Sequence, residues 1–410
     1  MNITLLGNGF DLYFKLPTKY VNFLNTVYYL SSRHMYATKM IGDVFGNKRL
    51  QAEDAWIAQS YDEYKEIYDT TPISADEIDK LTALSNNMWF KYLWESLNKD
   101  IGWIDFETEI ALVVRCFQER FLKSASSRST FHSPLSAEAE YIIKKFDFFI
   151  DETTKQENFS PYGFQETKSM YCVEYPIGSG NMIWDKKKIV SVLSTDLVEF
   201  TEGLKTYLDC FVDRILPGLI KQKAIAESDF VRYSDYVVTF NYSSTYERIG
   251  LSGNVFHVHG TLDESIVLGI NPDVNDAVEN VDTTFISFKK YYQRTMIKSD
   301  EEYIKWLRQN KGLQEHIHLV IMGHSLDISD KDIIAELFNL ANEIVVLYHN
   351  EEAKSAYISN LVRIFGSDGF TSLRLEKSLS FVDLYSDYSA LIETRKKTCS
   401  PELRKVTWLY

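Results

Sequence analysis

The chain has 410 residues, of which 45% are hydrophobic and 25% are charged, and its formal net charge is −14. These ordinary globular fractions exclude disorder, collagen and coiled coil as the main architecture. The length exceeds the about 250–300 residues at which a single core stops growing, so two domains or one domain with an insertion are expected. The acidic balance disfavours a general binder of nucleic-acid backbone, whereas a small anion held by backbone amides needs no net positive charge.

Cysteine usage and hydropathy indicate the compartment. No two of the four cysteines are close enough in sequence to form a C-x-x-C knuckle, so no structural zinc ribbon is expected. The first residues lack the basic segment of a secretory signal, and no apolar run reaches the about 18 residues of a membrane-spanning helix. The sequence therefore predicts a cytoplasmic protein without a membrane segment.

Short segments rich in Val, Ile and Leu are typical of buried parallel strands. Helical patterns lie between several of them, notably at 330–342, and such alternation predicts an open, doubly wound α/β sheet. The predicted strands are 2–6, 235–240, 254–258, 265–268, 316–322 and 343–348.

Residues 31–230 differ, because apolar residues recur there at helical spacing and strand signals are few. The stretch 151–189 is polar and aromatic and is predicted to be a loop or small subdomain. We therefore expect an α/β core at 1–30 and 190–410, interrupted by a mostly helical insertion at 31–189. The predicted helices of this region are 78–99, 105–123, 136–150 and 190–216.

A glycine turn, Gly7-Asn8-Gly9-Phe10-Asp11-Leu12, directly follows the first predicted strand. Glycines at such a turn let the backbone approach a diphosphate closely, at a helix N-terminus whose N–H groups are unpaired. The third glycine of the dinucleotide fingerprint is absent, since Leu12 stands in its place. A tight strand-to-helix turn without a ligand is the structural alternative, and Asp11 is either a partner of the helix dipole or a ribose contact.

Three more polar clusters end predicted strands: Thr239–Ser243 with Asn241, His257–Thr261 with His259 and Gly260, and Gly323–Asp330 with His324 and Ser325. The carboxyl ends of parallel strands line the ligand crevice of an open sheet, so four clusters at that edge favour a functional site.

Structural alternatives remain for several of these residues. Asn241 could cap a helix that starts at Ser243 or Ser244. His257 and His259 are two apart on a predicted strand and could form half a metal site, but no partner pair supports one. His316 and His318 alternate in the same way at the start of their strand and are expected to be structural.

The order of these motifs resembles the sirtuin-like NAD-binding fold, which is a Rossmann-type parallel sheet. More specifically, the chain resembles the AbiH-type phage abortive-infection proteins. The matching motifs are Gly7–Leu12, Leu16–Tyr20, the run Trp103-Ile104-Asp105-Phe106-Glu107, Thr239–Tyr242, His257-x-His259-Gly260 and Gly323–Leu326.

This resemblance implies an antiphage effector that hydrolyses NAD to nicotinamide and ADP-ribose through an oxocarbenium-like state. It implies that His259 is the base at a ribose hydroxyl and that Asn241 orients ribose or water, with no metal needed. A neutral histidine near pH 7 suits that role. The nucleotide contacts implied are Gly7, Asn8, Gly9, Phe10, Asp11, Gly260, Gly323, His324 and Ser325.

The chain also departs from the sirtuin pattern, because it lacks the four-cysteine zinc module and carries Ser243 where an acid is usual. These departures disfavour protein deacylation. They leave open a nucleotide sensor without catalysis, or a metal-dependent phosphohydrolase or nuclease using His257 and His259. A hydride-transfer dehydrogenase is the weakest alternative, since the fingerprint is incomplete.

A constant NAD-cleaving activity would be toxic, so gating by oligomerisation or by the insertion acting as a lid is expected. A homo-oligomer and a phage-derived trigger or partner protein are the expected partners. For Trp103, Asp105 and Glu107 a structural role in a first helical turn is favoured over a role in the site.

Overall fold

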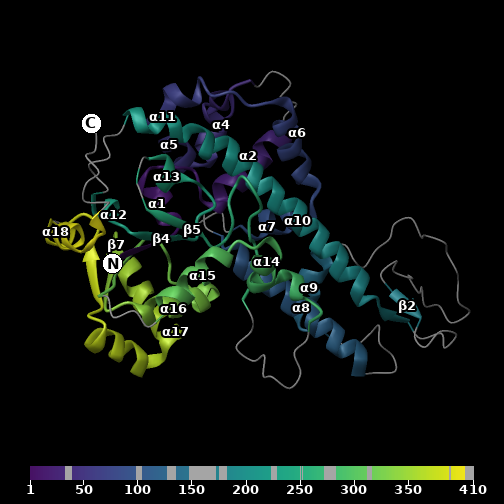
Figure 1. Cartoon of the computed structure of the whole chain (residues 1–410). Helices are drawn as coiled ribbons and strands as arrows, with labels where there is room; N and C mark the ends of the chain where they lie inside the picture. The colour runs from purple at the N-terminus through teal and green to yellow at the C-terminus, as the bar shows by residue number, and fades with distance from the viewer. Residues whose placement is uncertain are drawn as a thin grey trace, which may run out of the picture. The chain divides into compact units, whose positions relative to one another are not determined.

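The computed structural model describes residues 1–32, 39–97, 104–126, 135–146, 172–174, 182–222, 229–249, 251, 253–271, 283–311, 316–386 and 389–401. The described chain is of the α/β class and divides into two compact units (Figure 1). The first unit comprises Met1–Ala83, Thr201–Asn271 and Lys290–Tyr410, and the second comprises Leu84–Phe200 and Pro272–Lys289.

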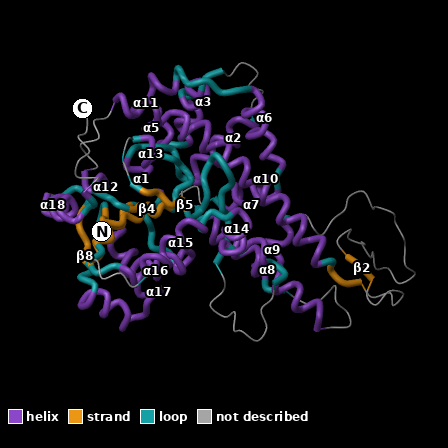
Figure 2. The backbone as a smooth tube through the Cα atoms, in the orientation of Figure 1, coloured by secondary structure: helices purple, strands orange, loops and turns teal. Residues whose placement is uncertain are grey.

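A six-stranded, all-parallel sheet forms the centre of the first unit, and Figure 2 shows its strands in orange. Their spatial order is β5-β4-β1-β6-β7-β8, which is 3-2-1-4-5-6 when the six are numbered along the chain. This is the strand order of the doubly wound dinucleotide-binding sheet, and the order reverses between β1 and β6. The strands are β1 (Asn2–Leu6), β4 (Tyr236–Thr239), β5 (Asn254–His257), β6 (His318–Met322), β7 (Glu343–Tyr348) and β8 (Ser380–Asp383).

Five of the six predicted strands are confirmed, and the predicted strand at 265–268 is wrong. That segment forms only an isolated bridge, between Ile266 and Gly260. Its apolar side chains are buried, but the segment does not join the sheet. A short apolar run indicates that a segment is buried and does not by itself show that it is a strand. Three strands were not predicted: β8, and the antiparallel pair β2 (Cys172–Glu174) and β3 (Met182–Trp184) within 151–189.

The two faces of the large sheet differ because side chains alternate along each strand. Ile3, Leu5 and Ile321 belong to one continuous apolar core with α15 (Glu301–Asn310), α16 (Lys331–Leu340) and α17 (Glu351–Glu376). The alternate residues of β1 are partly polar. Thr4 accepts a hydrogen bond from the buried Arg395 guanidinium of α18 (Ser389–Thr398), at 2.7 Å.

Residues 31–83 belong to the compact unit that contains the sheet. The two units therefore do not divide at residues 30 and 190, which are the predicted boundaries between the core and the insertion. Tyr64, for example, donates to the Phe14 carbonyl at 2.5 Å. The other helices of this unit are α1 (Asn8–Tyr13), α2 (Tyr20–Ser31), α3 (Ile41–Phe45), α4 (Lys48–Glu53), α5 (Ala55–Tyr68), α6 (Ala75–Ala83), α11 (Leu216–Gln222), α12 (Asp229–Arg232), α13 (Thr245–Arg248) and α14 (Lys290–Ile297).

The second unit is mostly helical, as the spacing predicted. Its helices are α7 (Met88–Ser96), α8 (Phe106–Ser126), α9 (Ala137–Lys145) and most of α10 (Lys186–Phe211). The predicted helix 78–99 is interrupted, because the Asn87 side chain accepts from the N–H groups of Trp89 and Phe90 and so starts α7 anew. In α8, the apolar residues that recur at helical spacing are buried, namely Phe106, Ile110, Val113, Val114 and Phe117.

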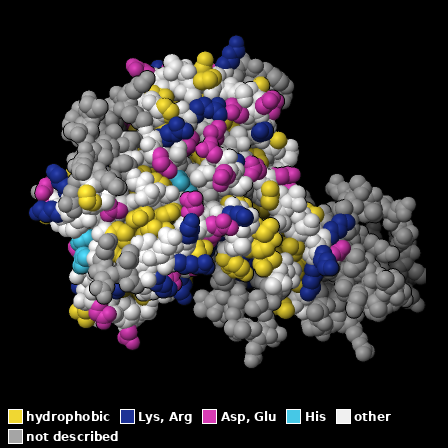
Figure 3. Space-filling model, viewed as in Figure 1, with side chains coloured by type: hydrophobic (Ala, Val, Ile, Leu, Met, Phe, Trp, Pro, Cys, Tyr) yellow, Lys and Arg dark blue, Asp and Glu magenta, His cyan; other side chains and the backbone are white. Residues whose placement is uncertain are grey.

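Acidic and basic side chains are interspersed on the face of the molecule seen in Figure 3, as on an ordinary solvated surface. A search of the described helices found none with the length and apolar character that a membrane crossing requires.

Candidate functional site

Four strands of the sheet end in one row. Leu6 of β1 is the register partner of Thr239 in β4 and of Met322 in β6, and Thr239 is in turn the partner of His257 in β5. The four predicted polar clusters therefore do lie along a single edge of the sheet, the carboxyl edge, next to the point where the strand order reverses.

The glycine turn after β1 packs directly against the turn after β6. The Gly9 N–H donates to the Gly323 carbonyl at 2.8 Å, and the Gly7 N–H donates to the Met322 carbonyl at 3.1 Å. A Cβ atom on Gly7 would lie 2.6 Å from His324 Cα, so no larger residue fits without a backbone shift. Close packing of two turns is thus sufficient reason for these glycines. Their N–H groups are used within the protein and are not open to a diphosphate here.

Asp11 forms the first polar cluster. Its side chain is buried in α1, and Ser243 Oγ donates to its Oδ2 at 2.6 Å while Thr245 Oγ1 donates to Ser243 Oγ at 3.0 Å. Its other oxygen, Oδ1, is buried and has no hydrogen-bond partner among the described residues. Burial raises the pKa of Asp11 to about 6, although the Ser243, Thr245 and Asn241 side chains act in the opposite direction.

His259 belongs to a second, charged cluster around Asp330. His259 Nε2 lies 3.2 Å from Asp330 Oδ1, and the Lys290 ammonium donates to the same oxygen at 2.7 Å. His324 Nε2 lies 3.5 Å from Asp330 Oδ2, and His324 Nδ1 accepts from the Leu326 N–H at 2.9 Å. All four clustered side chains, His259, Lys290, His324 and Asp330, are less than 10% exposed.

The protonation states within this cluster follow from burial and charge. Burial, together with the positive charge of Lys290, lowers the pKa of His259 to about 4, so the imidazole is neutral at pH 7. Burial alone would raise the pKa of Asp330, but Lys290 and His259 hold it well below its usual range. The cluster is therefore an ammonium–carboxylate pair with two imidazoles beside it.

The segment after β4 links the two clusters. The Phe240 ring lies 5.0 Å from the His259 ring and 4.2 Å from the His324 ring, centroid to centroid. Three residues further on, Ser243 contacts Asp11. Asn241 lies between and does not cap a helix, since α13 starts at Thr245 with Ser244 as its N-cap, so the capping alternative is wrong.

His257 and His259 do not share a metal site in this arrangement. Strand β5 ends at His257, whose Nε2 lies 2.7 Å from Glu247, whereas His259 lies beyond the strand and faces Asp330. This separation removes the geometric basis for the phosphohydrolase or nuclease alternative at these two residues.

The remaining predicted nucleotide contacts differ in their surroundings. Gly260 has a φ of +82° in a tight turn, where a Cβ atom would lie 1.9 Å from the Ser265 carbonyl oxygen. Phe10 is buried with its ring 5.3 Å from Phe14, whereas Asn8 and Ser325 are exposed.

Of the group Trp103, Asp105 and Glu107 at the start of α8, the structure describes the two acidic residues. Asp105 caps that helix by accepting from the Glu107 N–H at 3.0 Å, as the structural interpretation expected, and Trp103 lies outside the described residues.

Comparison with protein families gives a match over residues 3–349 to the model described as bacteriophage abortive infection AbiH. The chain belongs to the AbiH family. The matched range of this AbiH protein runs from β1 to the end of β7 and contains both polar clusters. Membership indicates an antiphage role through abortive infection. Neither the curated proteins nor the solved structures searched contain a match.

Sequence reasoning missed the groups that hold these clusters together. The motifs assign no role to Lys290 or Asp330, and they mark Ser243 only as a departure from the sirtuin pattern. Asp330 ends the quoted Gly323–Asp330 motif, so its place after β6 was a usable signal. Nothing in the local sequence marks Lys290, which reaches Asp330 across 40 residues.

Proposed function

We propose that this AbiH protein acts in abortive infection as an NAD glycohydrolase that releases nicotinamide and leaves ADP-ribose. Its strand order and its polar carboxyl edge support a nucleotide site beside β1, because ligands of open parallel sheets bind where the strand order reverses. The AbiH family supplies the antiphage context.

Asp11 is the observation that carries the proposal. A buried carboxyl group with one unpartnered oxygen and a pKa of about 6 exchanges a proton near neutral pH. That property suits a general base for the attacking water or a ribose hydroxyl, and perturbed carboxyl groups of this kind concentrate at functional sites.

The base role thereby moves from His259 to Asp11. With a pKa of about 4, His259 is a weaker base than Asp11 at pH 7, and it already faces Asp330. We assign His259 a positioning role and retain Asn241, next to Asp11, as the residue that orients ribose or water. Bond cleavage then depends on positioning and electrostatic stabilisation of the oxocarbenium-like state.

Burial of the site indicates gating. Asp11, Asn241 and His259 are 2%, 8% and 4% exposed, so a dinucleotide reaches them only after the edge opens. A closed resting state suits an activity that would kill the host cell if it were constant. Opening by a phage-derived trigger or by homo-oligomerisation is part of the same proposal.

The test measures NAD in cells before and after phage infection. Cells with the wild-type protein should lose NAD after infection, whereas cells with Asp11→Asn or Asn241→Ala should keep it. Asp69→Asn is the control, because this carboxylate likewise accepts from a side-chain hydroxyl, that of Tyr61, but belongs to neither cluster. Constant NAD in protected wild-type cells would refute hydrolysis.

The same burial favours one second candidate, a sensor that binds a nucleotide without turnover. Calorimetry of the purified full chain with NAD, followed by chromatography of the products, separates the two. Saturable binding that Asn241→Ala abolishes, without nicotinamide release in the test tube or NAD loss in infected cells, would establish the sensor.

A further inference from the structure

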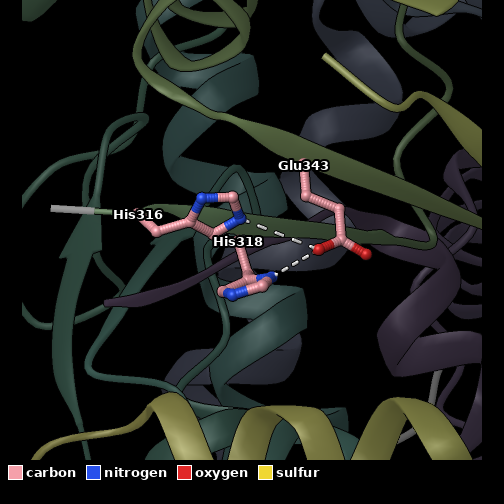
Figure 4. A group of neighbouring side chains, drawn as sticks. All are labelled: His316, His318 and Glu343. Atoms are coloured by element: carbon pink, nitrogen blue, oxygen red, sulfur yellow. Dashed lines mark ion pairs between the residues drawn. The ribbon is translucent and has the colours of Figure 1, made fainter.

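A separate group of two histidines and a glutamate, residue types that can ligate a metal, lies at the opposite, amino edge of the sheet (Figure 4). His318 Nδ1 lies 2.8 Å from Glu343 Oε2, and His316 Nε2 lies 3.9 Å from the same oxygen. The two imidazole rings are 4.6 Å apart, centroid to centroid. Along β6, this edge is about 13 Å from the carboxyl edge, at about 3.3 Å per residue.

The sheet itself brings these three residues together. His318 and Glu343 are register partners in the parallel pair β6–β7, and His316 precedes His318 by two residues, which places it on the same side. The backbone between them is fixed: the Ile317 N–H donates to Asn342 Oδ1 at 2.9 Å, and the Ile317 carbonyl accepts from the Glu343 N–H at 3.2 Å.

We propose that His316, His318 and Glu343 bind a divalent transition metal, with Zn²⁺ the best match. Two imidazole nitrogens and one carboxylate oxygen are a zinc ligand set that leaves a fourth position for water. One donor atom from each residue lies within 4.8 Å of the other two.

The donor spacing fits such an ion. With metal–ligand bonds of about 2.1 Å, tetrahedral donors lie about 3.4 Å apart, and the distances of 2.8 and 3.9 Å bracket that value. Small side-chain rotations would complete the shell. His316 is 61% exposed and gives the ion access to the donor atoms.

The contrast with another potential ligand group supports this assignment. Glu77, Asp209 and Cys210 also lie within ligand distance of one another, but the Arg214 guanidinium lies 2.6 Å from Glu77 and 2.7 Å from Asp209. A cation therefore already neutralises that group. At the amino edge the nearby Met1 amino group donates instead to the His316 carbonyl, at 3.0 Å, and no described Lys or Arg makes an ion pair with Glu343.

A metal ion bound here would link β6 to β7 at the edge opposite the residues assigned to NAD. Metal binding can therefore be tested independently of NAD hydrolysis. The full chain, stripped with a chelator and dialysed, is titrated with ZnCl₂ by calorimetry at pH 7.5. Saturable binding of one ion is expected, with a rise in melting temperature because the ion binds the folded state.

His316→Ala is the main variant, because this exposed side chain can be removed without disturbing the core. Both His316→Ala and Glu343→Gln should weaken Zn²⁺ binding by about 10- to 100-fold or more. Loss of a residue that only supports a metal ligand already weakens binding by that factor. The matched control is His349→Ala, which removes an exposed histidine outside the group and should bind as wild type does. Absence of saturable binding, or binding that survives both His316→Ala and Glu343→Gln, would overturn the proposal.

Discussion

Gly9 and Gly323 lie back to back, from two turns more than 300 residues apart in sequence. A Cβ atom on Gly9 would lie 2.5 Å from Gly323 Cα, and Gly323 itself has a φ of +71°. The N–H of Gly9 donates to the Gly323 carbonyl across this contact. The junction of β1 and β6 therefore depends on two residues without side chains.

Gly9→Ala should destabilise the protein by about 1–3 kcal/mol, the usual cost of overpacking, because the clash is with backbone and cannot be relieved by a side-chain rotation. Urea unfolding measures the change. Gly369→Ala is the control: this glycine lies inside α17, where an added Cβ atom would meet only the Phe365 Cβ atom, at 3.0 Å, so alanine there should cost less than about 1 kcal/mol. Equal effects of the two substitutions would contradict the packing argument.

Asp11→Asn should stabilise the protein at pH 7. A pKa raised from 3.8 to about 6 means that the folded state binds a proton more tightly, so stability falls as pH rises from about 4 to 6. The variant has no carboxylate to ionise, so its free energy of unfolding at pH 7 should exceed that of the wild type by as much as about 3 kcal/mol. This figure follows from about 1.36 kcal/mol for each pKa unit. The variant's advantage should disappear at pH 4.

Asp54→Asn is the contrasting control for Asp11. Asp54 is also buried, but its carboxylate accepts hydrogen bonds from Asn22, Asn25 and two backbone N–H groups. The Asp54→Asn substitution should therefore lower the free energy of unfolding by about 1–3 kcal/mol at pH 7, because buried N–H groups lose the oxygen that accepts from them. A gain in stability from Asp54→Asn would refute this contrast.

His259→Gln should change the pH profile in the opposite direction. The folded-state pKa of His259 is about 4, so the wild-type protein loses stability as pH falls from 6.5 to 4, by up to about 3 kcal/mol. The variant lacks this loss. Its stability relative to wild type should improve steadily over that window in thermal melts, and parallel profiles of the variant and the wild type would contradict the lowered pKa.

Lys290→Met should cost about 3–5 kcal/mol, because it leaves the buried Asp330 carboxylate without its ammonium partner. Adding Asp330→Asn should recover part of the loss, and a double-mutant cycle in urea measures the coupling. Lys311→Met is the control, since its ion pair with Glu336 is exposed and should contribute at most about 1 kcal/mol. A cost of Lys290→Met no larger than that of Lys311→Met would contradict the buried pair.

The strands that build the sheet were predictable because their residues form short, continuous apolar runs. The segment 265–268 shows the limit of that signal, because Val267 and Leu268 are buried beside the turn after β5 without forming a ladder. Strand β8 (Ser380–Asp383) is not predicted, although it has the same length and burial pattern as β5, so burial does not explain the difference between them.

Local sequence determined that polar residues follow β1, β4, β5 and β6, and parallel pairing then required them to share one edge. Only the tertiary structure decided which side chains meet there. In the fold, His259 and Lys290 both lie beside the Asp330 carboxylate, and Ser243 donates a hydrogen bond to Asp11. The N–H groups of the two glycines after β1 donate to carbonyl groups at the end of β6 and in the turn after it. The physical reason is that strand formation depends on neighbouring residues, whereas burial and ion pairing depend on groups that the fold brings together from distant parts of the chain.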